Sequence, residues 1–323
     1  MIVVTGGAGF IGSAIIWRLN SLGEDKIIIV DELGHDEKWK NLVGLNYYDF
    51  INKDDFIQKI ENGIDIDIKA IIHMGANSST TEKDADHLLR NNYEYTKKLA
   101  HFCMAKNVRF IYASSAATYG DGALGFDDSE NVSQFLRPLN MYGYSKNLFD
   151  VWAIKQGIMD KIAGIKYFNV YGPNEYHKGD MRSVVHKAFE QIKSTGKVKL
   201  FKSRNPEYKD GEQMRDFIYV KDAVDMTLFF LDKKDKNGLF NVGSGKARTW
   251  NDLVTAIFKA MDKSVNIEYI ELPEHLVEKY QYFTEAKLEK LKKAGYSNPL
   301  TSLEEGVTDY VKNYLLKNKY FGL

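Results

Sequence analysis

The sequence contains a single cysteine, Cys103, among its 323 residues. One cysteine excludes an internal disulfide framework, and that absence fits a protein that folds in a reducing compartment. Cys103 lies in a stretch, 99–105, whose apolar spacing is typical of a helix. We therefore expect its thiol to be packed in the core and to be unreactive.

Charge of one sign and long apolar runs are also missing. Lysine plus arginine and aspartate plus glutamate number 44 each, so no net field attracts nucleic acid or an acidic membrane surface. No apolar run approaches about 20 residues, the length that crosses a bilayer. The first predicted strand begins at Ile2, which leaves no room for a secretion signal. We therefore predict a cytoplasmic protein with neither a nucleic-acid nor a membrane partner.

Buried strands alternate with helices along the first half of the chain. The patterns predict strands at 2–5, 26–31, 70–73, 109–113 and 165–169, and helices at 10–22, 84–106 and 145–156. Strand–helix–strand units within about 30 residues require parallel strands. The fold class is therefore α/β, with a Rossmann-type doubly wound parallel sheet that is covered by helices on both faces.

The regular alternation of buried strands and helices ends after about residue 173. Polar loops at 173–179 and 202–213 precede a predicted strand at 239–242, a helix at 250–261 and a strand at 266–270. We interpret residues 1–173, with interleaved segments near 215–245, as a dinucleotide-binding domain. Residues 174–323 would form mainly a smaller C-terminal α/β lobe that binds the substrate.

A glycine-rich loop joins the first predicted strand to the first helix. Gly6 permits a tight turn, Gly9 lets the backbone approach a pyrophosphate, and Gly12 allows close packing of helix on strand. The helix that begins at Phe10 and Ile11 presents unpaired N–H groups and the positive end of its dipole to the anion. The loop therefore predicts a dinucleotide site.

The choice between NAD and NADP depends on charges at the end of the second strand. Asp31 is placed to accept hydrogen bonds from the adenosine ribose, and together with Glu32 it would repel a 2′-phosphate. Lys38 and Lys53 could neutralise that phosphate if the fold brings them there. The residues alone leave both cofactors open.

A tyrosine and a lysine four residues apart, Tyr142 and Lys146, would share one helix face. A free tyrosine has a pKa of about 10, and a nearby cation (Lys146 together with a nicotinamide ring) favours the phenolate that a base requires. Upstream, Ser115 lies where a strand ends in small hydroxyl residues, facing the ligand crevice of a parallel sheet. Tyr119 and Tyr144 are the alternatives to Tyr142.

The glycine loop, the strand-end serines and the Tyr-x-x-x-Lys pair, in this order and separation, resemble the extended short-chain dehydrogenase/reductase superfamily. Further matches to its nucleotide-sugar epimerase and dehydratase branch are 73–76, 91–92, 167–173 and 215–220. Within that branch, the segments 78–82, 113–120, 139–146, 168–173, 177–179 and 280–284 are similar to the ADP-heptose 6-epimerases. The dehydratases carry an acidic pair where this sequence has Ala116 and Ala117, so we do not expect water elimination.

The resemblance implies roles for individual residues. The implied catalytic residues are Ser115, Tyr142, Lys146 and Lys178, with Lys178 as a second acid/base on the opposite side of the sugar. The implied cofactor-binding residues are Gly6, Gly9, Phe10, Ile11, Gly12, Asp31, Glu32, Lys38, Lys53, Met74, Gly75, Ala76, Asn77, Ser78, Asn91, Asn92, Tyr142, Lys146, Val170 and Lys178. The implied substrate-binding residues are Asn169, Asp180, His186, Lys187, Phe201, Lys202, Ser203, Arg204, Arg215 and Tyr280. No metal site is expected.

The implied reaction is inversion of C6″ of an ADP-linked heptose through a keto-sugar, for lipopolysaccharide core synthesis, with a recycled cofactor. NADP is favoured over NAD because the family usually prefers it, and a homo-oligomer such as a pentamer is expected. A UDP-hexose 4-epimerase is the main alternative. A non-catalytic dinucleotide sensor is disfavoured because Ser115, Tyr142 and Lys146 are all present.

Some positions depart from the family pattern. Glu32 replaces a residue that is usually neutral, Asp180 stands where a small hydroxyl residue is common, and 205–214 is a lysine-rich insertion. The register at His186 and Lys187 is ambiguous. Arg215 is expected to clamp the substrate pyrophosphate bidentately. Its alternative role is an ion pair with Asp216.

Overall fold

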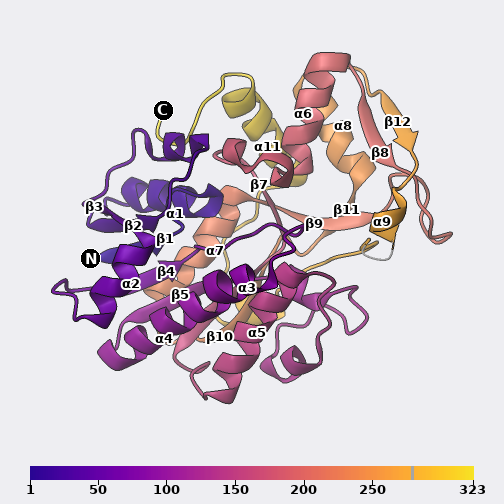
Figure 1. The fold of residues 1–323 in the computed structure, drawn as a ribbon. Coiled ribbons are helices and arrows are strands. Elements are labelled where there is room, and N and C mark those ends of the chain that lie inside the picture. Colours follow the sequence, from indigo (N-terminus) through magenta and orange to yellow (C-terminus); the bar gives the residue numbers. More distant parts are fainter. Residues whose placement is uncertain (278–279) are drawn as a thin grey trace.

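A parallel sheet forms the centre of the computed structural model, which describes residues 1–277 and 280–323 (Figure 1). Within those residues the sheet has seven strands in the order β10-β6-β5-β4-β1-β2-β3. The strands are β1 (Ile2–Thr5), β2 (Ile27–Asp31), β3 (Asp49–Asn52), β4 (Ala70–His73), β5 (Arg109–Ser115), β6 (Ile162–Tyr167) and β10 (Gly238–Val242). The order reverses between β1 and β4, and a ligand crevice opens at such a switch point beyond the carboxyl ends of the strands.

Helices cover both faces of this sheet. They include α1 (Phe10–Ser21), α2 (Lys53–Glu61), α4 (Tyr95–Lys106), α5 (Met141–Lys155) and α7 (Val220–Asp232). Alternate strand residues point to opposite faces. Accordingly, Val4 and Ile29 pack in one core cluster with residues of α1 and α7, whereas Val3 and Ile28 pack in another with residues of α2, α4 and α5. The predicted doubly wound α/β fold is confirmed.

The predicted helix over 84–106 is not continuous. It consists of α3 (Ala85–Leu88), a π-helical turn η2 (Leu89–Glu94), and α4. The extra residue of a π turn displaces the backbone locally, and such turns often occur at functional sites. Here the turn buries Asn92, whose side chain accepts a hydrogen bond from the Asn77 amide at 2.8 Å and donates to Ser145 at 3.0 Å.

The predicted strand over 165–169 is divided between two sheets. β6 ends at Tyr167, and β7 (Asn169–Tyr171) belongs to a three-stranded sheet ordered β11-β9-β7, with β9 (Met214–Tyr219) and β11 (Ala247–Thr249). The chain changes sheet at Phe168, whose amide still donates to the Val242 carbonyl of β10 at 2.9 Å. Asn169 is thereby carried out of the main sheet toward the crevice.

The remaining elements form the smaller C-terminal part. They are a two-stranded sheet of β8 (Val198–Phe201) and β12 (Ile267–Ile270), and helices α6 (Val184–Thr195), α8 (Trp250–Ala260), α9 (Glu274–Val277), α10 (Glu289–Lys293) and α11 (Leu303–Asp309). Short 3-10 turns are η1 (Glu37–Leu42), η3 (Ala116–Tyr119), η4 (Glu130–Phe135) and η5 (Tyr176–Met181), and η6 (Tyr310–Leu315) is a π turn. β10 returns to the main sheet, and the predicted division at residue 173 stays a prediction.

Cys103 of α4 and Arg109 of β5 are two buried groups of the elements around the main sheet. Cys103 on α4 is completely buried, and burial raises the pKa of its thiol. Arg109, at the start of β5, donates to the carbonyls of Phe230 at 2.9 Å and Lys236 at 2.8 Å. No helix within the described residues is long and apolar enough to cross a membrane.

Candidate functional site

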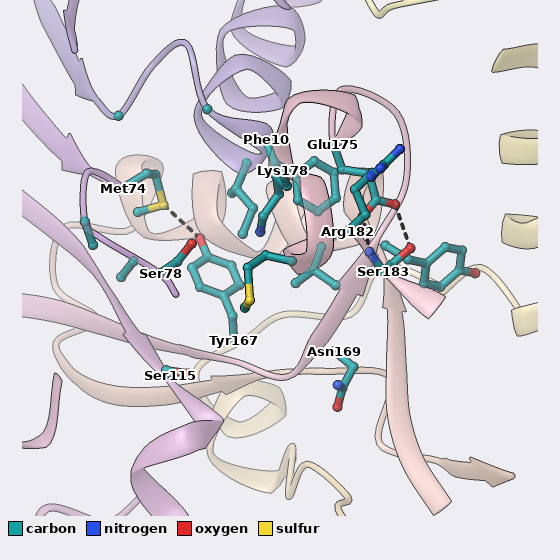
Figure 2. A pocket seen from close by; sticks show the side chains of 18 of the residues that line it. Phe10, Met74, Ser78, Ser115, Tyr167, Asn169, Glu175, Lys178, Arg182 and Ser183 are labelled. Carbon is teal, nitrogen blue, oxygen red and sulfur yellow. Dashed lines mark hydrogen bonds between the residues drawn. The ribbon is translucent and has the colours of Figure 1, made fainter. Parts of the chain in front are cut away.

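A cavity of about 800 Å³ opens at the carboxyl ends of β1, β4 and β5 (Figure 2). A second cavity of about 310 Å³ adjoins it and shares Gly6, Asp31 and Lys38 with it. Together the two cavities are lined by every predicted cofactor-binding residue except Asn92. Asn92 lies beneath the wall, where it holds Asn77.

The glycine loop has the shape that a pyrophosphate requires. Gly6 has φ +64°, and a Cβ there would lie 2.6 Å from Gly75 Cα. A Cβ on Gly12 would collide with the Gly6 carbonyl oxygen. α1 begins after Gly9 with no side-chain cap and no acidic residue in its first turn. Its N-terminal N–H groups are therefore available to an anion, and the loop fits a dinucleotide.

Both lysines predicted near the adenosine ribose are present at the end of β2. Asp31 accepts hydrogen bonds from the Ala8 amide at 2.8 Å and from Lys38 Nζ at 2.9 Å. Lys53 forms an ion pair with Glu32, and this contact lowers the pKa of the Glu32 carboxyl. The fold therefore supplies acidic and basic groups at the same place.

Ser115, Tyr142 and Lys146 converge from β5 and α5 on the large cavity. The Asn140 side chain caps α5 by accepting from the Gly143 amide at 2.8 Å, which places Tyr142 in the first helical turn. A Cβ on Gly143 would lie 2.6 Å from the Ala117 carbonyl oxygen, so the glycine lets the helix approach the turn that follows Ser115 closely. The predicted helix at 145–156 thus begins one turn earlier than expected.

Burial shifts the pKa values of Tyr142 and Lys146. Burial raises the pKa of Tyr142, and the hydrogen bond with Ser115 only partly opposes that rise. In the protein by itself, desolvation of the phenolate is therefore the larger effect, and the lowering expected from Lys146 together with a nicotinamide ring stays a prediction. Burial also lowers the pKa of Lys146 to about 8, against the opposing charge of Asp150.

The two alternative tyrosines are placed elsewhere. Tyr119 is buried, donates to Asn241 Oδ1 at 2.7 Å, and has a raised pKa because of burial. Tyr144 is 51% exposed on the outer side of α5. Of the three candidates, Tyr142 is the one that lines the cavity.

Lys178 reaches the same cavity from the turn η5. Its Nζ lies 5.6 Å from the centre of the Phe10 ring, and Figure 2 shows it beside Phe10 while Ser115 occupies a separate part of the wall. Burial lowers the pKa of Lys178, and the nearby Glu175 carboxylate opposes this shift. Glu175 is itself buried and accepts from the Ser183 hydroxyl at 2.6 Å, which fixes the segment after η5.

The predicted substrate-binding residues are divided by the structure. Asn169 lines the large cavity. His186 is buried against Tyr176 with ring centres 5.4 Å apart, Lys187 is exposed on α6, and neither lines a described cavity. The α6 residues that do line it are Val184 and Val185. The assignments of His186 and Lys187 stay predictions.

The predicted residues near β8 also lie outside the described cavities. Lys202 pairs with Glu271 at 2.7 Å, and Arg204 pairs with Glu274. The Ser203 amide donates to Asp210 at 2.9 Å, which folds the lysine-rich insertion back onto β8. Asp180, on η5, is exposed. Roles in substrate binding for Phe201, Lys202, Ser203, Arg204 and Asp180 stay predictions.

Arg215 lies between two aromatic rings. Its guanidinium carbon is 5.5 Å from the ring centre of Trp250 and 5.5 Å from that of Tyr280. Burial lowers its pKa to about 10. Asp216 is engaged by backbone amides, including Ser244 at 2.6 Å and Ala286 at 2.9 Å, and Arg215 makes no ion pair with the described residues. The alternative of an Arg215–Asp216 ion pair is wrong.

Some residues that line the cavity were not singled out from the sequence as binding residues. Trp250 joins the wall from the start of α8, and Tyr167 joins it from the end of β6. His177 lies next to Lys178 and contacts Asn41, with 3.2 Å between their nitrogens. Burial lowers the pKa of His177 to about 4. In the sequence, His177 could have been proposed as a binding residue because it belongs to the 177–179 segment that resembles the family.

Comparison with known proteins gives matches over almost the whole chain. The model of the NAD dependent epimerase/dehydratase family matches residues 2–243. The ADP-L-glycero-D-manno-heptose-6-epimerase of Nitratidesulfovibrio vulgaris (strain DP4) is 57% identical over 316 residues, covering 98% of each chain.

Solved structures show the same relationship. A crystal structure of the Helicobacter pylori ADP-L-glycero-D-manno-heptose-6-epimerase has a TM-score of 0.78 and 29% identity, covering 97% of this chain and 95% of that chain. The UDP-N-acetylglucosamine 4-epimerase of Methanobrevibacter ruminantium M1 has a TM-score of 0.82 and 25% identity, covering 98% of both chains. Together with the glycine loop, these matches show that the chain is an enzyme that uses a nicotinamide cofactor and belongs to the NAD dependent epimerase/dehydratase family.

Proposed function

We propose that the protein inverts C6″ of ADP-D-glycero-β-D-manno-heptose to give the L-glycero epimer, through a transient keto-sugar. The observation that carries this proposal is that two proton-transfer groups, Tyr142 and Lys178, line one cavity from different structural elements. The high identity to relatives named for this reaction supports the choice of sugar. The heptose product would enter lipopolysaccharide core synthesis in the cytoplasm, and the enzyme would act as a homo-oligomer.

The chemistry calls for two kinds of group. The hydrogen on the inverted carbon is not acidic, so a bound nicotinamide supplies the acceptor and donor of hydride. The protein must remove the hydroxyl proton and return it. Tyr142, with its raised pKa, is protonated at neutral pH and suits proton donation. Lys178, with its lowered pKa, has a larger neutral fraction than a free lysine and suits proton removal. A keto-sugar that turns over can meet each group in succession.

We propose NADP as the cofactor in preference to NAD. Lys38 and Lys53 both stand at the end of β2, where a ribose 2′-phosphate would lie. Each is paired with a carboxylate, Asp31 or Glu32, so phosphate binding requires the lysines to exchange partners. Chromatography of the nucleotide released from the purified protein tests this choice. Release of NAD alone would refute it.

The function is tested by proton NMR of the purified protein with ADP-D-glycero-β-D-manno-heptose, without added cofactor, beside a sample with UDP-glucose. We expect conversion of the heptose to the L-glycero epimer, and no UDP-galactose. Formation of UDP-galactose would establish a hexose 4-epimerase instead. If neither sugar changes while the nicotinamide is bound, the heptose assignment is wrong.

Substitution of Arg215 by methionine tests substrate recognition. A guanidinium that hydrogen-bonds a pyrophosphate contributes about 1.5–3 kcal/mol, so we expect KM to rise about 10- to 100-fold with little change in kcat. Arg248→Met is the matched control. Arg248 lies opposite Arg215 in the antiparallel register of β11 and β9, but its guanidinium forms an ion pair with Glu304 at 2.6 Å. Equal KM values for Arg215→Met and wild type would show that Arg215 does not hold the substrate.

A further inference from the structure

A buried ion pair lies directly behind the serine-bearing end of β5. Asp150 of α5 is 0% exposed and Lys166 of β6 is 1% exposed, and Lys166 Nζ lies 2.8 Å from Asp150 Oδ2. Neither side chain is among those that line the two cavities. The proposed proton transfers do not use them.

The pair is hydrogen-bonded to residues on both sides of Ser115. Ser114 Oγ donates to Asp150 Oδ2 at 2.7 Å, and Lys166 Nζ donates to Thr118 Oγ1 at 2.8 Å. Ser114 precedes Ser115 on β5, and Thr118 lies in the turn η3 that follows it. The ion pair therefore fixes the backbone that carries Ser115 before and after that residue.

The same carboxylate is part of the catalytic helix. Tyr142, Lys146 and Asp150 follow one another at intervals of four along α5, so they lie on one face of the helix. Asp150 therefore ties this face to β5, through Ser114, and to β6, through Lys166. Any shift of α5 along β5 would break these bonds.

The sheet makes room for this arrangement. Tyr112 Oη donates to Asp150 Oδ1 at 2.8 Å. The partner of Tyr112 on β6 is Gly164, and a Cβ there would lie 2.5 Å from the phenol oxygen. A glycine inside a strand weakens the strand, so a close approach such as this one is its usual reason.

Stability is a poor explanation for the pair. Two charges lose their hydration energy when they are buried, and their mutual attraction often does no more than offset this loss. A protein with two apolar side chains of similar size in their place is frequently as stable. The polar groups around Asp150 and Lys166 are satisfied by Tyr112, Ser114 and Thr118. Such a fully connected network specifies the positions of its members.

We propose that Asp150 is a positioning residue for the active site, and that its carboxylate, held by Lys166, fixes Ser115 against α5 and provides the negative charge that faces Lys146. The inference deepens the proposed function, on which the catalytic roles of Ser115, Tyr142 and Lys146 rest. Lys146 is beside the tyrosine that exchanges the substrate proton, so its charge stabilises the phenolate as it forms.

The effect of losing Asp150 on the pKa of Lys146 depends on the titratable groups that surround Lys146. Tyr142 lies on the same helix, His73 lies on β4 with a pKa that burial and Lys146 both lower, and Lys166 meets the Asp150 carboxylate from β6. Asp150 is the group that raises the pKa of Lys146 against burial. Without that carboxylate the ammonium loses its proton at lower pH.

The test is a titration of Lys146 in Asp150→Asn by NMR of the protein labelled with [13Cε]lysine. The Lys146 signal is identified by its loss in Lys146→Met, and the nicotinamide remains bound throughout. Neutralising one adjacent charge is expected to lower the midpoint by about one pH unit relative to wild type measured in the same way. The fall of kcat at high pH is expected to move to lower pH by the same amount, with KM little changed.

Arg109→Met is the matched control, because Arg109 is a buried charge on the same strand as Ser115 but at its opposite end. It should lower stability while leaving the Lys146 midpoint in place. If Asp150→Asn does not fold, the double variant Asp150→Asn/Lys166→Met removes both charges of the ion pair together and should shift the midpoint in the same direction by less.

A Lys146 midpoint that is the same in wild type and in the folded Asp150 variants would overturn the inference. So would an equal shift in Arg109→Met, which would mean that loosening the fold is sufficient. Because the titration needs no sugar, it still decides the inference if wild-type protein fails to convert the heptose. That failure would count against the proposed function alone.

Discussion

Replacing Tyr142 by phenylalanine, or Lys178 by methionine, is expected to lower kcat for epimerisation on the order of 10²- to 10⁴-fold, the usual contribution of a positioned acid or base. Each substitution removes the proton-transfer atom and keeps most of the side-chain volume. Both side chains line the large cavity but come from different elements, α5 and η5. We therefore do not expect the remaining group to replace the one that is removed. Steady-state kinetics followed by NMR give the size of both effects.

The chain offers a close control for each change. Tyr144→Phe alters an exposed tyrosine two residues along the same helix. Lys193→Met alters a lysine that lies 5.8 Å from the Phe189 ring centre, much as Lys178 lies over Phe10. Both controls should keep kcat within about twofold of wild type, as is usual for surface substitutions. A fully active Lys178→Met enzyme would remove Lys178 from the reaction and leave Tyr142 as the only proton-transfer group proposed.

The two variants should also differ from one another. If each group serves one epimer, each variant should retain transient reduction of the bound nicotinamide by one epimer and lose it with the other. Absorbance of the reduced cofactor after mixing with either pure epimer measures this directly. Identical losses with both epimers in both variants would contradict the assignment of one group to each epimer.

The second large effect is expected at the glycine loop. In Gly12→Ala, the added Cβ collides with the Gly6 carbonyl oxygen, so α1 must move away from the turn that would hold the pyrophosphate. We expect the purified variant to contain less than about a tenth of the wild-type nicotinamide, since losing a single charge-assisted contact of about 1.5–3 kcal/mol already weakens binding tenfold or more. Nucleotide released by denaturation and measured by chromatography gives the occupancy.

Gly23→Ala controls for a general effect of alanine at a glycine of this helix. Gly23 follows the other end of α1, has φ +83°, and has open space around its Cβ position. Alanine there is expected to cost about 1 kcal/mol of unfolding free energy through its strained φ, with full cofactor content. Normal nicotinamide content in Gly12→Ala would mean that the loop does not contact the pyrophosphate as we infer.

Much of the fold follows from local patterns. The apolar runs at β1, β4 and β5 and the glycine spacing before α1 mark their elements within a few residues, because a strand buried on both faces is largely apolar. Tyr142, Lys146 and Lys178 could be proposed because their spacing or family segment survives as a short continuous motif, and the fold places them in one cavity.

Features made by distant segments could not be predicted in this way. In the sequence, Lys166 is predicted only as one residue of a buried strand. Its ion pair with Asp150 depends on the register between β5 and β6, which the sequence pattern does not give. The residue pattern over 84–106 predicts one continuous helix and does not mark the extra residue of the π turn at η2. Likewise, which α6 residues reach the cavity depends on how that helix rotates, and His186 packs against Tyr176 instead.

The burial of Cys103 has a practical consequence. A thiol that water does not reach and whose pKa is raised stays unreactive toward alkylating reagents while the protein is folded. A cysteine introduced at an exposed site such as Tyr144 would therefore be the sole point of attachment for a fluorescent or paramagnetic probe, with no need to remove the native thiol. Probe uptake by the unaltered protein would, in turn, report opening of the structure around α4, because Cys103 is completely buried while that helix stays packed.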